Sequence, residues 1–188
     1  KEREAILNIF QSKYAQDKAQ DVLRLLKLFP LNNQTWELVE KLPKKLRERY
    51  WEEEYPAIGD ISEGEINKFI SKMLNSNRPK SAFFAVHYFA NKISTSNMVK
   101  LLQAISIDTN EGENDVRIAK YDISTFFQEL DKRDDMPRSE LAQLEFIFLS
   151  ILDHSDYAIP NLLQEIIESP ILFNQILAIA FKRNDDKK

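Results

Sequence analysis

Glycine is nearly missing from this chain, which has only three in 188 residues: Gly59, Gly64 and Gly112. Loops that bring backbone close to a phosphate or a cofactor usually need glycine, because glycine adopts positive φ at no steric cost. The sequence has no glycine-rich loop, and we expect no cofactor. Instead, amphipathic segments begin at Ser, Asn or Asp and stop at Pro, a pattern typical of helices.

The spacing of apolar residues predicts about eleven helices and no strand, because no segment sustains a period of two. Connections are short, which favours antiparallel neighbours. We therefore predict an all-α fold, a short irregular α-solenoid, with a compact helical bundle as the alternative. The length fits one domain over residues 1–188, or a subdivision into 1–58 and 59–188. The polar stretch 108–115 is predicted to be a loop.

Several helix boundaries follow from capping residues. Asn33 is expected to cap the helix after Pro30, and Ser62 with Glu65 has the spacing of a capping box. Pro79 is expected to open one helix that continues through Ala90, and Pro160 another. The most apolar helix is predicted over 141–152, with Phe148 in the core.

Composition limits the function classes. With no cysteine, the chain forms no disulfide or thiolate metal site, and a reducing, cytoplasmic location is expected. No apolar stretch approaches the roughly 18 residues of a membrane span. The net charge of −4, from 26 basic and 30 acidic residues, argues against a generalised nucleic-acid surface. We expect a protein partner or an intramolecular domain partner and no membrane.

Five segments carry a resemblance: "LFPLNNQTWELVEKLPKKLRERYWEE" (28–53), "NRPKSAFFAVHYFANKISTSNMVKLLQAI" (77–105), "YDISTFFQELD" (121–131), "LAQLEFIFLSILD" (141–153) and "PNLLQEIIESPILFNQILAIAFK" (160–182). They resemble the carboxy-terminal helical region of large bacterial proteins. The resemblance implies a bacterial source and a helical module of a larger protein. Its motifs are packing patterns, so it implies no catalytic residue. The chain begins with Lys1 instead of Met, and we expect it to be a fragment.

The two histidines have no partner at a metal-ligand spacing, so we expect no metal site. His87 lies among aromatic residues and is interpreted as a partly buried ring with one satisfied nitrogen. His154 follows Asp153 at a helix end, where the macrodipole favours a cation. No serine lies in a nucleophile elbow, which leaves nucleophilic catalysis without support.

Glu145 has two interpretations because it lies within the most apolar helix. Burial there would raise its pKa, as a general acid requires. Alternatively, the side chain points along the helix edge toward a basic partner such as Arg138 or Lys182, and this is the interpretation we favour.

Basic residues gather in one segment between Trp36 and Glu54, with aromatic residues interleaved. The members of this possible interaction surface are Lys41, Lys44, Lys45, Arg47, Arg49 and Trp51. On one helical face they would contact phosphates while aromatic rings stack on bases. The alternative is a solvated face with the pairs Lys44–Glu48 and Arg49–Glu53, while Trp36, Leu46 and Tyr50 pack between helices.

Taken together, these features predict a non-enzymatic helical interaction or scaffold module, with no catalytic, cofactor or metal residues. It would bind a protein partner or another domain of the same chain. Nucleic-acid binding through residues 41–51 is the alternative.

Overall fold

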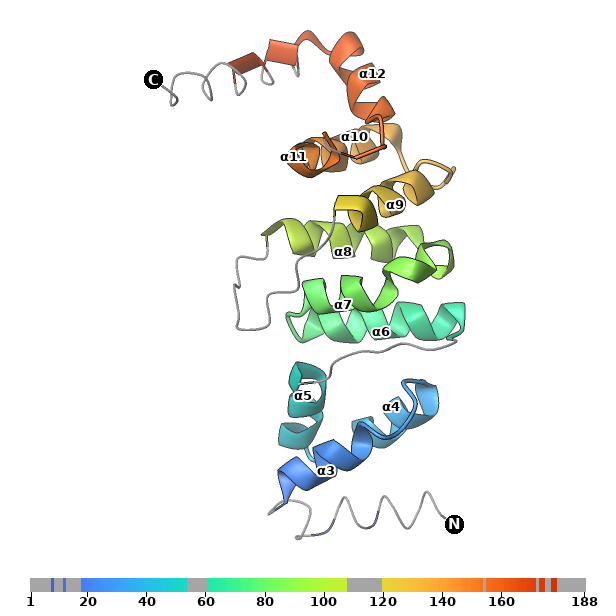
Figure 1. The fold of residues 1–188 in the computed structure, drawn as a ribbon, viewed down its shortest axis with the longest axis vertical. Helices are drawn as coiled ribbons and strands as arrows, with labels where there is room; N and C mark the ends of the chain where they lie inside the picture. Colours follow the sequence, from blue (N-terminus) through green and yellow to red (C-terminus); the bar gives the residue numbers. More distant parts are fainter. Residues whose placement is uncertain are drawn as a thin grey trace. The chain divides into compact units, whose positions relative to one another are not determined.

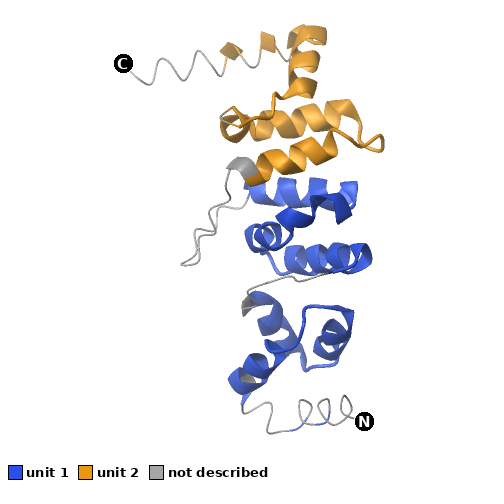
Figure 2. Cartoon of the chain, turned by 45° about the vertical axis from the view of Figure 1, so that its right-hand side comes forward, with its two compact units in different colours: residues 1–116 blue, residues 117–188 orange. Residues whose placement is uncertain are grey.

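The computed structural model describes residues 8, 12, 18–53, 61–107, 120–153, 155–171, 173, 174, 177 and 178. It divides the chain into two compact units, residues 1–116 and 117–188 (Figure 2). This boundary differs from the subdivision at residue 58 that we considered from the sequence. The predicted loop at 108–115 and the predicted cation His154 lie outside the described residues.

Helices make up the regular structure of both units, and the described residues contain no strand, so the all-α prediction is confirmed there. Unit 1 contains α3 (Ala19–Leu26), α4 (Asn33–Glu40), α5 (Lys44–Glu53), α6 (Glu63–Asn75), α7 (Pro79–Val86), the 3-10 helix η1 (His87–Lys92) and α8 (Thr95–Ile107). Unit 2 contains α9 (Lys120–Leu130), α10 (Arg138–Ile147), α11 (Leu149–Leu152) and α12 (Pro160–Glu168), as Figure 1 shows.

Capping residues set the helix starts largely as the sequence indicates. The capping box of Ser62 and Glu65 is present at α6, and Pro79 and Pro160 occupy the first turns of α7 and α12. The cap of α4 is one residue earlier than predicted. The Asn32 side chain, not that of Asn33, accepts the Thr35 backbone N–H at 3.0 Å.

The end of α6 shows how the chain turns without glycine. Asn77 adopts the left-handed conformation, with φ of 55°. The Asn77 N–H donates to the Leu74 carbonyl and the Arg78 N–H donates to the Met73 carbonyl, both at 3.0 Å. This is the bonding of a Schellman motif, in which asparagine replaces the usual glycine. A short polar side chain tolerates positive φ better than most, so the scarcity of glycine does not prevent a tight turn.

Two helices predicted to be continuous are broken. The helix from Pro79 ends at Val86, and a 3-10 helix follows with Phe89 off helical geometry. The predicted helix over 141–152 breaks at Phe148, whose ψ of 9° ends α10. Phe148 is buried, as predicted, and packs 5.8 Å from the Phe127 ring centroid. The break directs α11 against α9, while α10 packs against α12.

Candidate functional site

The basic segment of α5 lies partly at the surface. Lys41, Lys44 and Lys45 are exposed, and Arg47 and Arg49 are half-buried. The predicted Lys44–Glu48 ion pair is present at 3.6 Å, and Arg47 lies 3.8 Å from Glu40. The side chain of Glu53, expected to pair with Arg49, lies outside the described residues. Acidic neighbours thus offset part of the positive charge.

The aromatic residues of this segment are buried. Trp36, Tyr50 and Trp51 are 0%, 1% and 4% exposed. Trp36 and Trp51 each lie within 6.4 Å of the Phe69 ring centroid on α6. Trp51 is therefore not part of an exposed interaction surface, because the core of unit 1 covers its ring. Trp36, Leu46 and Tyr50 are buried, in line with the interpretation that they pack between helices.

His87 has the environment that the sequence indicated. It is 6% exposed, and its Nδ1 lies 2.8 Å from the Phe84 carbonyl oxygen. Because a carbonyl only accepts, Nδ1 carries the hydrogen and donates it. Across the part of the chain that the structure describes, no three His, Cys, Asp or Glu residues are grouped where they could hold a metal ion.

Glu145 is fully buried, and its carboxylate is bound by three donors. The Tyr157 hydroxyl donates to Oε1 at 2.6 Å, and the Asn161 side-chain amide donates to the same oxygen at 2.9 Å. The backbone N–H of Leu162 donates to Oε2 at 2.5 Å. The prediction that Glu145 pairs with a basic residue is wrong for Arg138, because Arg138 donates to the Gln164 side chain instead. Lys182, the other basic residue considered, lies outside the described residues.

The position of these donors explains why a carboxylate lies in the core. Leu162 belongs to the first turn of α12, whose N–H groups have no partner within the helix. The N-cap residue, Ile159, supplies no side-chain cap and has φ of 47°, which is costly for a β-branched residue. Glu145 of α10 thus replaces the missing cap, and its negative charge is favourable at the positive end of the α12 dipole.

Tyr157 completes this network as a hydrogen donor. Burial is the main cause that raises the pKa of Tyr157 above its ordinary value, followed by the hydrogen bond and the charge of Glu145. The phenol therefore stays protonated at neutral pH and donates to the carboxylate. Since both oxygens of the buried Glu145 are occupied by protein donors, the geometry supports a structural role more than proton transfer to a substrate.

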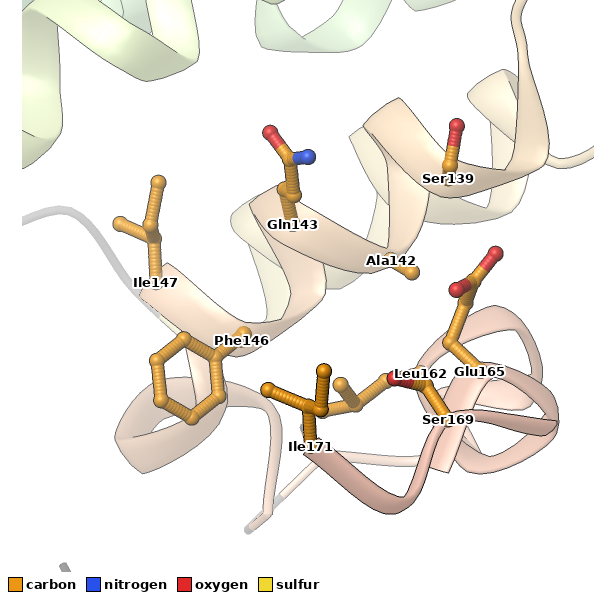
Figure 3. Close-up of a pocket in the computed structure, with 9 residues that line it drawn as sticks. All are labelled: Ser139, Ala142, Gln143, Phe146, Ile147, Leu162, Glu165, Ser169 and Ile171. Atoms are coloured by element: carbon orange, nitrogen blue, oxygen red, sulfur yellow. The ribbon is translucent and has the colours of Figure 1, made fainter. Parts of the chain in front are cut away.

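An open groove of about 480 Å³ lies between α10 and the α12 region (Figure 3). We call it the α10–α12 groove, and its lining residues are Ser139, Ala142, Gln143, Phe146, Ile147, Leu162, Glu165, Ser169 and Ile171. Figure 3 shows Phe146 and Ile171 approaching each other at one end, while Ser139 and Glu165 lie at the other. One end is thus apolar and the other polar and acidic.

Two exposed apolar side chains line this groove. Ile147 is 52% exposed and Ile171 is 73% exposed. Leu163 and Ile167 of α12 are also exposed, at 49% and 82%, but they are not among the lining residues. Single exposed apolar residues are common, but a group beside a groove is typical of a binding surface. The sequence carried one signal for it, since Ile147 lies next to the core residues of α10 but is itself exposed.

The charge around the groove is strongly negative. Between positions 120 and 171 the sequence has eleven acidic and four basic residues, whereas between 18 and 107 it has ten acidic and fourteen basic. None of the described lining residues is basic, and Glu165 is among them. Glu140, also exposed, follows Ser139 on α10. Unit 2 therefore combines an apolar groove with an acidic surrounding.

A second hollow, of about 530 Å³, lies at the turn between α9 and α10 and the start of α12. Its lining includes Asp131, Arg133, Asp134 and Arg138. Asp131 also accepts a hydrogen bond from Asn161 at 2.9 Å, which connects this hollow to the Glu145 network. Its mixed charges do not select a ligand of either sign.

Comparison with protein-family models, with curated proteins and with solved structures found no match to this chain. None of the described helices combines the length and the apolar character needed to cross a membrane. Function is therefore inferred from the geometry of the described residues.

Proposed function

We propose that this chain is a non-enzymatic interaction module that holds a helix, from a protein partner or from another domain of the same protein, in the α10–α12 groove. The α-solenoid arrangement predicted from the sequence belongs to this proposal, because stacked helix pairs present extended binding surfaces. A cytoplasmic location, a bacterial source and a place within a larger protein stay predictions.

The observation that carries the proposal is the group of exposed apolar side chains around a preformed groove. Ile147 and Ile171, which line the groove, leave apolar area in water, which is unfavourable by roughly 25 cal/mol per Å². Covering this area would recover that free energy. Helices bind such grooves through apolar residues spaced three and four positions apart.

The nucleic-acid alternative has weaker support. Its basic residues are present on α5, but Lys44 and Arg47 have acidic partners. The rings that would stack on bases are buried in unit 1. What remains for that alternative is phosphate contact alone, which is sequence-independent and strongly salt-dependent.

Photo-crosslinking tests the proposal. We would place a photoreactive phenylalanine at position 147 or 171, both of which are exposed and line the groove, and a matched one at position 107 on α8, where Ile107 is 78% exposed. The expected result is one protein or one segment of the full-length chain crosslinked from 147 and 171 but not from 107. The purified partner should then bind the native chain and lose binding to Ile147→Lys.

Two results would contradict the proposed binding site. Equal crosslinking from all three positions, or a partner whose affinity is unchanged by Ile147→Lys, would show that the groove is not the binding site. Crosslinking to nucleic acid from residues 41–49 would favour the alternative.

A further inference from the structure

We infer that the occupant of the α10–α12 groove is a basic amphipathic helix of a partner protein. This inference rests on the proposed function and adds the chemistry of the partner. Two observations lead to it: the apolar end of the groove and the carboxylates of Glu140, Glu165 and Glu168 on α10 and α12.

The shape and lining of the groove select an amphipathic helix. Phe146 and Ile147 of α10, Leu162 of α12 and Ile171 after α12 supply the apolar part of the lining. A helix that contributes apolar residues at positions i, i+3, i+4 and i+7 presents a matching apolar strip. The hollow is open to solvent on one side, so the opposite face of the bound helix would stay in water and remain polar.

The charge of the surroundings selects a basic partner. Glu165 lies in the groove and Glu140 and Glu168 are exposed on the two helices that flank it. Arg138, the described basic residue of these two helices, donates to Gln164, which in turn donates to Glu168. An acidic helix would bring like charges together, whereas lysines on the rim of a basic helix would find carboxylates. Such complementarity mainly governs partner choice and association rate.

The other occupants predict different behaviour. A second copy of unit 2 would bring together two grooves that each carry Glu165 in the lining and exposed Glu140 and Glu168 on the flanking helices. A nucleic acid would meet the same repulsion. The basic helix is the occupant that this surface favours.

A designed peptide series tests the inference with the whole chain. The probe is a fluorescent 18-residue helix of leucine and lysine, with the leucines on one face. One control has glutamate in place of lysine, and another has the same composition in scrambled order without an apolar face. We expect the leucine-lysine helix to bind at least about tenfold more tightly than either control, as fluorescence anisotropy would measure. The affinity should fall as salt increases.

Variants of the chain place the binding site. Ile147→Lys should weaken binding of the leucine-lysine helix by about tenfold or more, because it puts a charge of the same sign into the groove. The matched substitution Ile107→Lys on α8 should leave affinity within about twofold. Because both side chains are exposed, the fold should persist, which circular dichroism would check. Ile171→Lys, at an even more exposed position, serves as a second groove variant.

The acidic rim has its own variants. The double substitution Glu140→Gln and Glu165→Gln should weaken binding about three- to fivefold and reduce its salt dependence. Glu37→Gln, at an exposed position of α4 in unit 1, should change neither. These variants separate charge recognition from apolar contact.

Each other result overturns the inference. If the leucine-glutamate and leucine-lysine helices bind with equal affinity and Ile147→Lys weakens both, the groove binds helices of any charge. The proposed function would then stand without a basic partner. Equal affinity for the scrambled peptide would indicate adhesion by charge alone. A dimer that sedimentation detects and Ile147→Lys disrupts would make a second copy the occupant. If no peptide binds but a crosslinked partner does, only the basic-helix inference fails.

Discussion

Each unit uses a carboxylate from one helix at the N-terminus of another, but in different surroundings. In unit 1, Glu65 of α6 lies near the surface and accepts the backbone N–H of Asn33 in the first turn of α4 at 2.9 Å. In unit 2, Glu145 of α10 is fully buried and accepts the N–H of Leu162 in α12. The first carboxylate supplements an aromatic core. The second is part of the core.

The difference concerns how much each packing arrangement depends on its polar group. Water competes for a carboxylate near the surface, so its net contribution is small. A buried carboxylate with three donors cannot be removed without leaving those donors unsatisfied. The position of α12 against α10, and with it the α10–α12 groove, should therefore depend on Glu145. The packing of α4 against α6 should depend mainly on Trp36 and Phe69, whose ring centroids lie 6.1 Å apart.

Removal of the buried carboxylate should have the largest effect. Glu145→Leu keeps most of the volume but leaves the Tyr157 hydroxyl and the Leu162 N–H without their acceptor. With a cost of about 1–3 kcal/mol for each unsatisfied group, we expect the free energy of unfolding to fall by about 4 kcal/mol in urea denaturation. Hydrogen exchange should show that the loss begins in α12. A change below about 1 kcal/mol would contradict the buried cap.

Removal of one donor should have a smaller effect. Tyr157→Phe deletes the hydroxyl that donates to Glu145, and we expect a loss of about 1.5–3 kcal/mol because the acceptor is charged. Burial raises the pKa of Tyr157 in the folded chain. Above the ordinary tyrosine pKa of 10.0, the unfolded chain therefore loses the hydroxyl proton of Tyr157, whereas the folded chain keeps it. Native stability should therefore fall as pH rises through this value, and less steeply in Tyr157→Phe. An unchanged alkaline profile would argue against this contribution.

The half-buried carboxylate of Glu65 should give a small, pH-dependent effect. The Asn33 backbone N–H, followed by the Ser62 hydroxyl, lowers the pKa of Glu65 from its ordinary value of 4.5. The contribution of Glu65 to the free energy of unfolding is therefore fully present above pH 4.5, the ordinary pKa. It is lost as pH falls through the lower pKa that Glu65 has in the folded state. Glu65→Gln should cost at most about 1 kcal/mol at neutral pH and should flatten the acid side of the stability profile. Glu63→Gln in the same turn removes one carboxylate without removing the Asn33 contact, and serves as the matched control.

The smallest effect should come from a polar atom of unit 1 that makes no hydrogen bond. Among the described residues, none accepts a bond from Nε1 of Trp36 or Trp51, although both atoms are buried. Replacing the indole of Trp36 by benzothiophene keeps the shape and removes the N–H donor. Stability should change by less than about 0.5 kcal/mol or increase, since a desolvated, unsatisfied group is lost. A loss as large as that for Tyr157→Phe would mean that both cores depend on polar contacts alike.

These two carboxylates also show what the sequence could predict. Ser62 and Glu65 are three residues apart, so local spacing alone predicted their capping box, and the same is true of the Lys44–Glu48 pair. Glu145 and Leu162 are 17 residues apart and meet only because α10 packs against α12. The hydrogen-bond partners of Glu145 thus could not be predicted from spacing.

The same reasoning applies to the helix breaks and the groove. Nothing in the local pattern of 141–152 indicates a break, because Phe148 leaves helical geometry in an arrangement where its ring packs on Phe127. In the basic segment, the sequence shows that Trp51 is adjacent to basic residues. It does not show that the Trp51 ring is buried in the core of unit 1, which depends on how the helices pack. The groove required both α10 and the residues after α12 to be placed in space.

The central claim is that this chain binds a helix in the α10–α12 groove of unit 2. Hydrogen exchange, followed by mass spectrometry with and without the leucine-lysine peptide, tests it most directly because both units are observed in one experiment. We expect added protection in residues 138–147 and 160–171 and none in α5. Protection confined to residues 41–53, or none in either unit at a saturating peptide concentration, would contradict the claim.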